Sequence, residues 1–378
     1  MKSLGGSRRP ELIGNLALLI FVLLLCLAGA EIALRLAGLQ IPAANPDLYV
    51  FDDTLGWIGR PNLGGKPSPS RPGAFAEMNR WGFRDDQPAS WEAASKRRRV
   101  MLLGDSYAMG YEIPKAMRVS ELLEKADTLL LVYNFGILAY SSDQELLVLK
   151  KYGPEIRPEI ILVFFCVNDI YYNEQDESRH PKPLFQRQAD GTLRLVNVPL
   201  RPPDWLDRSA GWLTTHLALG KITSQAVARL TMALRPVSRR TQSERWFVGR
   251  AGGREEQLLN ASTEQASNLT YSILRDIRNV SARLGAELYV FMCPSSARWT
   301  ETRDDSPEGI KLAQSWWQNL NVPVVDLFPV LRKDWLDNKE DLYIYDKMHW
   351  NERANRLIAD SVMKTIQTRF SASPDTSN

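Results

Sequence analysis

The sequence predicts an α/β fold with a doubly wound parallel sheet, preceded by an apolar N-terminal helix. From residue 100 onward, short apolar runs alternate with amphipathic runs, which is typical of strands and helices in that architecture. The chain of 378 residues, 44% hydrophobic and 24% charged, is long enough for one large domain or two smaller ones. Its net charge of +3 gives no reason to expect a nucleic-acid partner.

The run Leu12–Ala30 carries no charge and is apolar on all sides. As a helix it is long enough to cross a bilayer core of about 30 Å, so it predicts a membrane anchor rather than a buried core helix. Residues 28–30, Ala-Gly-Ala, also fit a signal-peptidase site, and a removed signal peptide is the alternative.

Basic residues flank this run unevenly. Lys2, Arg8 and Arg9 precede it, whereas only Arg35 follows closely. The positive-inside rule then predicts a cytoplasmic N-terminus and an exported remainder. The expected organisation is a cytoplasmic segment 1–11, an anchor helix 12–38, an irregular extracytoplasmic segment 43–99 that packs by its aromatic residues, a sheet domain 100–370 and a disordered tail 371–378.

Five apolar runs predict the strands of the sheet, and their order along the chain predicts right-handed crossovers. They are the run from Val100 to the turn at residues 104–106, Thr128–Phe135, Ile160–Val167, Glu287–Cys293 and Val322–Phe328. Helices are expected at Asp143–Tyr152, at 269–284 where apolar residues recur every three or four positions, at Glu308–Asn319, and after residue 351.

The alternation stops between residues 170 and 260. A hairpin is expected there around Asp190-Gly191, and the whole segment is interpreted as an insertion that forms a cap or a partner surface. The basic run Lys96–Arg99 is interpreted as a solvated loop, with contact to lipid headgroups as the alternative.

The cysteines and histidines give no metal-binding pattern, so no metal and no cofactor are expected. Cys166 and Cys293 lie in apolar strand-like runs, which predicts buried thiols and no disulfide framework. Of the three histidines, His180 and His216 fall in the insertion and are interpreted as surface or cap residues.

Ser106 follows the first strand in the sequence Gly-Asp-Ser. A residue at that point lies at the carboxyl end of a parallel strand, where open α/β sheets place their ligand crevice. Ser106 is therefore a candidate nucleophile, and the alternative is an ordinary turn.

The third histidine, His349, lies three residues after Asp346 and just before the last helix. This spacing lets a carboxylate orient one imidazole nitrogen and leave the other to accept the proton of a serine hydroxyl. The alternative is a neutral loop histidine that caps a helix. Asn168, at the end of the third strand, could donate its amide to an oxyanion or cap the following helix.

The order of these motifs resembles the SGNH (GDSL-type) hydrolase superfamily over roughly residues 100–370. The resemblance implies a flavodoxin-like three-layer α/β/α sandwich with a five-stranded parallel sheet. It implies Ser106 as the nucleophile, Asp346 and His349 as its partners, and Asn168 as an oxyanion donor. Counting from Asn134, it implies that the backbone N–H of Ala139 is a further donor, together with the N–H of Ser106.

Two positions depart from the family pattern. Cys166 stands where the family has the glycine of Gly-x-Asn-Asp, and Ala139 stands where it has the oxyanion glycine. The expected function is an exported, membrane-anchored serine esterase that removes an acyl group, such as acetyl, from a surface carbohydrate. The alternatives are an O-acyltransferase of cell-surface polysaccharide, and a catalytically weak scaffold in polysaccharide assembly.

Overall fold

The computed structural model describes residues 9–37, 48–67, 75–176, 178, 181–204, 209, 217, 219–220, 222–223, 262–294, 308–344 and 348–370. The chain forms two compact units, Met1–Pro46 with Pro203–Gly253 and Asp47–Pro202 with Arg254–Asn378. The expected insertion at 170–260 is therefore divided, because residues 170–202 belong to the unit that holds the sheet.

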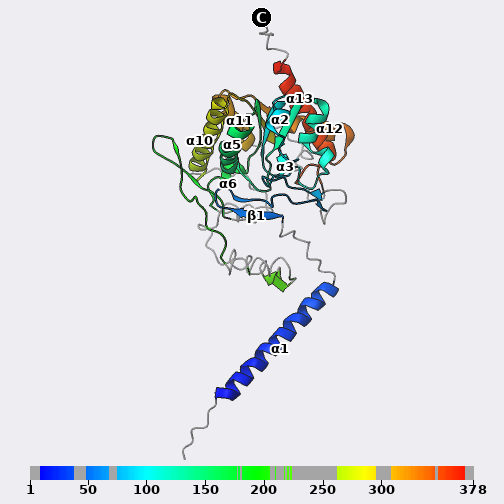
Figure 1. Ribbon diagram of the computed structural model, residues 1–378, viewed down its shortest axis with the longest axis vertical. Coiled ribbons are helices and arrows are strands. Elements are labelled where there is room, and N and C mark those ends of the chain that lie inside the picture. Colours follow the sequence, from blue (N-terminus) through cyan, green and yellow to red (C-terminus); the bar gives the residue numbers. More distant parts are fainter. Residues whose placement is uncertain are drawn as a thin grey trace, which may run out of the picture. The chain divides into compact units, whose positions relative to one another are not determined.

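Helix α1 (Arg9–Leu36) is the one described helix that is long and apolar enough to cross a membrane, over Ile13–Leu36 (Figure 1). Its bounds are close to those of the predicted anchor helix, 12–38. Glu31 and Arg35, spaced one turn apart, pair at 2.8 Å in its last turns. An anchor and a signal sequence share this length and composition, so both expectations for the N-terminus stay open.

The central sheet has five strands, and all of its pairings are parallel. Its strands are β5 (Arg98–Gly104), β6 (Leu130–Asn134), β7 (Ile160–Cys166), β10 (Glu287–Cys293) and β11 (Val324–Asp326). The order across the sheet is β11-β10-β7-β5-β6, so the chain reverses direction across the sheet between β5 and β7. This is the flavodoxin-like order, and it confirms the predicted fold.

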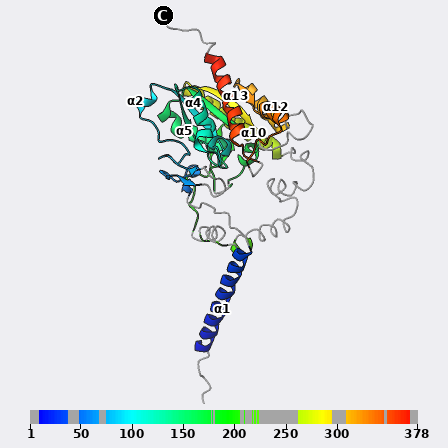
Figure 2. The same cartoon turned by 90° about the vertical axis from the view of Figure 1, so that its right-hand side faces the viewer.

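Helices cover both faces of the sheet (Figures 1 and 2). One face carries α5 (Ser142–Ile156), α10 (Ser262–Arg283) and α11 (Glu308–Asn319), and the other carries α4 (Val119–Ala126), α12 (Phe328–Asn338) and α13 (Glu352–Phe370). Met101 and Leu103 of β5 pack under the first set, whereas Val100 and Leu102 pack under the second. The alternation of strand side chains thus builds a core on each face.

The helices α4 and α12 were not predicted from the sequence. The expected strand Val322–Phe328 is shorter than predicted, because α12 begins at Phe328 directly after β11. The helix predicted at Asp143–Tyr152 continues as α5 to Ile156.

The segment before the sheet is more regular than expected. It holds an antiparallel hairpin of β1 (Tyr49–Asp52) and β2 (Gly56–Gly59). The segment also contains β3 (Lys66–Pro67), β4 (Phe75–Ala76) and α2 (Trp91–Ala94). Its aromatic residues pack on the core as predicted: Trp57 and Phe83 are buried, and the ring of Trp81 stacks on Phe135 with the centroids 6.0 Å apart.

The hairpin predicted around Asp190-Gly191 is confirmed as β8 (Phe185–Arg187) and β9 (Leu193–Leu195). The Asp190 carboxylate accepts a hydrogen bond from the Thr192 N–H at 2.9 Å, and Gly191 takes a left-handed conformation with φ of 81°. Arg275 of α10 donates to the Gly191 carbonyl at 2.6 Å, which ties the hairpin to the sheet unit.

Candidate active site

Ser106 begins α3 (Ser106–Met109), a single helical turn directly after β5. The Asp105 side chain caps this helix by accepting a hydrogen bond from the Tyr107 N–H at 2.8 Å. Gly110 ends it in the left-handed conformation, with φ of 66°. The strand, the cap and the terminating glycine together place Ser106 at the carboxyl edge of the sheet.

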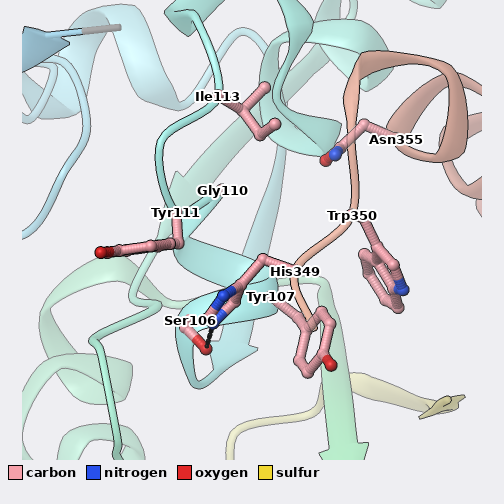
Figure 3. Close-up of a pocket in the computed structure, with 8 residues that line it drawn as sticks. All are labelled: Ser106, Tyr107, Gly110, Tyr111, Ile113, His349, Trp350 and Asn355. Carbon is pink, nitrogen blue, oxygen red and sulfur yellow. Dashed lines mark hydrogen bonds between the residues drawn. The ribbon is translucent and has the colours of Figure 1, made fainter. Parts of the chain in front are cut away.

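His349 meets Ser106 across 243 positions of the chain. Its Nε2 atom lies 2.8 Å from the Oγ atom of Ser106, as Figure 3 shows. The His349 carbonyl accepts a hydrogen bond from the Ile344 N–H at 2.8 Å, so the loop that carries the histidine closes on itself. The two residues therefore have the geometry of a nucleophile and its general base.

Three other predicted residues lie outside the described part of the chain. Asp346, proposed to orient His349, is one of them, and His180 and His216 are the others. The role of Asp346 stays a prediction from its spacing to His349.

The loop after β6 lies against the nucleophile turn. The Asn134 amide donates to the Ala108 carbonyl at 2.8 Å, and its oxygen accepts from the Gly136 N–H at 2.9 Å. A Cβ atom at Gly136 would lie 2.1 Å from the Met109 nitrogen, so only glycine allows this approach. Asn134 and Gly136 thus brace the turn that presents Ser106.

Ala139, in the same loop, takes a left-handed conformation with φ of 64°. Glycine adopts this conformation freely, whereas alanine does so at a cost of about 1–2 kcal/mol. The chain therefore keeps the backbone turn that a glycine would favour. The role of the Ala139 N–H as an oxyanion donor stays a prediction.

Asn168 precedes α6 (Asp169–Tyr172) at the end of β7, and its side chain makes no capping hydrogen bond to that helix. The helix-cap alternative for its amide is therefore not supported. Asn168 is exposed. Gly104 of β5 pairs with Phe164 of β7, so the segment that follows β7 and carries Asn168 begins beside the nucleophile turn. The two strands flank the point where the strand order reverses, the usual ligand crevice of this fold.

Cys166 sits directly behind the nucleophile turn. Burial raises the pKa of the Asp105 carboxyl and that of the Cys166 thiol, and the charges of the two groups influence each other. Cys166 and Cys293 are both buried and free, as predicted.

Four carboxyl groups are buried near this edge, and burial is the largest cause of a raised pKa for each. They are Asp105, Asp143, Glu145 and Asp169. Neighbouring carboxyls raise the pKa of Glu145 further, and in the part of the chain that the structure describes neither of its oxygens has a hydrogen-bond partner.

Lys182 is the cation of this group, and its side chain is fully buried. Its Nζ atom lies 2.5 Å from the Asp143 carboxylate and 3.1 Å from the Ser141 hydroxyl, and it donates to the Tyr172 carbonyl at 2.7 Å. Lys182 belongs to the segment that was expected to be an insertion. It instead fastens that segment to the N-terminus of α5, beside the candidate site.

A second buried group supports the nucleophile turn from the other side. Arg84 donates to the carbonyls of Gly110 and Ile113, and burial with the nearby Arg118 lowers its pKa to about 9. Asp85 accepts from the Asn134 N–H at 3.0 Å, and burial raises its pKa to about 7. Both residues position the loops around Ser106.

Aromatic rings surround the Ser106–His349 pair. The ring of Tyr111 lies 4.5 Å from the His349 ring, and the ring of Tyr107 lies 4.4 Å from that of Trp350. A hollow lies beside the pair. Its lining, drawn in Figure 3, consists of Ser106, Tyr107, Gly110, Tyr111, Ile113, His349, Trp350 and Asn355.

Sequence reasoning missed the residues that support the site rather than form it. Arg84 and Asp85 lie 22 and 21 residues before the nucleophile in an irregular segment, and Lys182 lies 76 residues after it. The one signal that was present is the strongly polar start of α5, residues 141–145 (Ser-Ser-Asp-Gln-Glu), all of them buried. A helix start of this kind is usually exposed, so its burial follows only from the tertiary structure.

No family model matches the chain, and no curated protein matches it. Among solved structures, it is similar to the psychrotrophic esterase EstA from Pseudoalteromonas sp., with 12% identity, a TM-score of 0.40, and coverage of 72% of this chain and 99% of that one. It is similar to the acetyl xylan esterase AlAXEase, with 11% identity, a TM-score of 0.39, and coverage of 71% and 99%.

A third similar structure is a member of the lipolytic G-D-S-L family from Veillonella parvula, with 11% identity, a TM-score of 0.38, and coverage of 71% and 98%. Similarity at these TM-scores carries no conclusion about this chain. By its own residues the chain resembles the SGNH (GDSL-type) hydrolases in the order of its motifs, in its parallel sheet and in the pairing of Ser106 with His349.

Proposed function

We propose that the protein is a serine esterase that removes a short acyl group, such as acetyl, from a carbohydrate or a related ester outside the cytoplasm. The observation that carries this proposal is the 2.8 Å contact between Ser106 Oγ and His349 Nε2 at the carboxyl edge of the sheet. A nucleophile, a base within hydrogen-bond reach and nearby donors are the parts that acyl transfer requires.

In the proposed reaction, His349 Nε2 takes the Ser106 hydroxyl proton as Oγ attacks the ester carbonyl. The oxyanion of the tetrahedral intermediate accepts hydrogen bonds from the N–H groups of Ser106 and Ala139 and from the Asn168 amide. The imidazolium, oriented by Asp346, returns the proton to the leaving alcohol and an acyl-serine forms. Water, deprotonated by His349, then releases the acid and restores the serine.

The proposed location rests on α1 and on the basic residues that precede it, which favour a cytoplasmic N-terminus and an exported sheet domain, 100–370.

The test is hydrolysis of p-nitrophenyl acetate by the full chain in detergent micelles. We expect turnover by the native protein and its loss in Ser106→Ala and in His349→Ala. Ser95→Ala is the matched control, because Ser95 is exposed and lies before β5, at the opposite edge of the sheet. Activity that survives Ser106→Ala would refute the proposed nucleophile.

The acceptor of the acyl group is tested in the same assay. Adding an oligosaccharide acceptor distinguishes an esterase, which releases acetate, from an O-acyltransferase, which transfers the acyl group to a sugar hydroxyl. We expect acetate release to dominate. Acylated sugar as the main product would overturn the esterase assignment and keep Ser106 as the nucleophile.

A further inference from the structure

Tyr107 follows the nucleophile directly, and its side chain reaches the loop that carries the base. The phenol donates a hydrogen bond to the Met348 carbonyl at 2.8 Å, across 241 positions of the chain. Met348 is the residue before His349. Two adjacent residues of the nucleophile turn, 106 and 107, therefore contact two adjacent residues of the histidine loop, 349 and 348.

The Tyr107 ring is fixed on the side of the loop. It lies 4.4 Å from the Trp350 ring and 5.6 Å from the His349 ring, measured between centroids. Trp350 in turn packs against Phe164 of β7, with the centroids 6.2 Å apart. Tyr107 is 7% exposed, and burial raises the pKa of its phenol well above the usual value, so the hydroxyl remains a donor throughout the neutral range.

Two backbone hydrogen bonds of this loop join described residues: Ile344 N–H donates to the His349 carbonyl at 2.8 Å, and Asn351 N–H donates to the Leu342 carbonyl at 2.9 Å. Both bonds tie the loop to itself. The bond from Tyr107 ties the loop to the nucleophile turn, so it contributes to where the imidazole lies relative to Ser106.

We propose that Tyr107 is a positioning residue, whose hydroxyl holds His349 against Ser106 through the Met348 carbonyl. This inference rests on the proposed function for its effect on turnover, but its structural content stands apart from catalysis. Without the hydroxyl, the loop loses its bond to the nucleophile turn, and His349 spends less time within reach of Oγ. Small misplacements of catalytic groups are costly because proton transfer depends on the distance between the reacting atoms.

The test is Tyr107→Phe in the full chain in detergent micelles, because this change removes the hydroxyl and keeps the ring. We expect kcat for p-nitrophenyl acetate to fall about tenfold, the order of one neutral hydrogen bond, while KM stays within about twofold. Inactivation by a fluorophosphonate should slow by a similar factor. Backbone hydrogen exchange should rise in residues 342–351.

The matched control is Tyr289→Phe. Tyr289 is also buried, and its hydroxyl bonds the Glu287 carboxylate at the amino end of β10, away from Ser106. It should leave kcat and the exchange of residues 342–351 unchanged. A Tyr107→Phe variant that lowers the melting temperature as much as Tyr289→Phe, with unchanged kcat and unchanged exchange in the loop, would overturn the positioning role.

Failure of the two proposals can be told apart. A native protein that neither turns over the ester nor reacts with the fluorophosphonate refutes the esterase function. In that case the exchange of residues 342–351 still decides the role of Tyr107: a rise in Tyr107→Phe but not in Tyr289→Phe supports it, and equal exchange overturns it.

Discussion

Charged side chains are placed differently at the two ends of the strands in the central sheet, called here the amino edge and the carboxyl edge. At the amino edge, the partly buried Arg97 and Arg99 pair with the partly exposed Glu124 and Glu159, at 3.5 Å and 2.6 Å. At the carboxyl edge, carboxyl groups are buried around the nucleophile turn and have raised pKa values. Burying an ionisable group costs stability. Groups with perturbed pKa values are therefore found mainly at functional sites, where they hold or activate reacting side chains.

The basic run 96–99 lies at the amino edge, and the contacts of its arginines show what these side chains do there. Arg99 packs over the Trp91 ring at 5.2 Å and pairs with Glu159, and Arg97 pairs with Glu124. The prediction of a solvated loop is wrong for Arg98 and Arg99, because both lie in β5 and are partly buried. Arg97 and Arg99 contact residues of their own domain, which gives no support to the alternative of lipid contact.

The largest effect in this comparison is expected for Lys182→Met. The change leaves the fully buried Asp143 carboxylate without its cation, and breaking a buried pair in this way costs about 3–5 kcal/mol. Urea unfolding of the full chain in micelles measures the loss. The double variant Lys182→Met/Asp143→Leu is the control and should recover much of it, because it removes both charges. A loss below about 1 kcal/mol would show that the pair is not desolvated as described.

The next effect is on the pH dependence of stability. The pKa of Asp85 is about 7 in the folded protein and has its ordinary value of 3.8 when unfolded. The folded state then binds more protons between these values, so stability is full below about pH 4 and falls as pH rises through 7. In Asp85→Asn, the free energy of unfolding should decrease less as the pH rises. The contribution of Asp85 to that decrease is about 1.4 kcal/mol per unit of pKa difference.

Urea unfolding of the native chain and of Asp85→Asn at pH 5 and at pH 8 tests this prediction. Asp86→Asn is the control, since Asp86 is a neighbouring carboxyl that pairs with Lys115 at the surface. Equal differences between the two pH values in the native chain and in Asp85→Asn would contradict a raised pKa at Asp85.

A smaller gain is expected for Ala139→Gly at the carboxyl edge. Glycine relieves the left-handed strain of about 1–2 kcal/mol and loses about 0.5–1 kcal/mol through the entropy of the unfolded chain. The difference is a gain of up to about 1.5 kcal/mol, which corresponds to a melting temperature higher by up to about 6 °C. A lower melting temperature would mean that the alanine methyl group contributes packing that offsets the strain.

The smallest effect is expected at the amino edge, for Lys96→Ala. The Lys96–Glu92 pair is 3.7 Å long, and both side chains are mostly exposed. Exposed pairs of this kind contribute about 0.3–0.5 kcal/mol. The unfolding free energy should therefore change by no more than about 0.5 kcal/mol, and by less at 0.5 M salt. A loss comparable with that of Lys182→Met would remove the contrast between the two edges.

The parts of the fold that repeat locally could be predicted from the sequence. Buried strands such as Glu287–Cys293 are continuous apolar runs, and Glu308–Asn319 has helical periodicity, so both were predicted with their observed bounds. Helix α4 was missed because its eight residues, Val-Ser-Glu-Leu-Leu-Glu-Lys-Ala, give too short a pattern. Helix α12 was missed because it follows β11 with hardly any intervening turn.

In the candidate site, too, some residues could be predicted from local patterns and others could not. Ser106 and His349 could be named because each sits at a strand end or before a helix with a recognisable neighbour. Tyr107 could not, because nothing near it shows that its hydroxyl meets a carbonyl 241 residues away. Lys182 could not be placed either, since a lysine in a polar segment is usually exposed. Contacts between distant segments depend on tertiary packing, which short patterns do not encode.

The most direct test of the central claim, that Ser106 and His349 act together as nucleophile and base, is labelling of the full chain by a fluorophosphonate, read by intact mass and peptide mapping. The native protein should gain one adduct, located on Ser106. His349→Ala should slow the labelling about 10²–10⁴-fold, the usual contribution of a general base. An adduct on another residue, or a labelling rate unchanged in His349→Ala, would contradict the account.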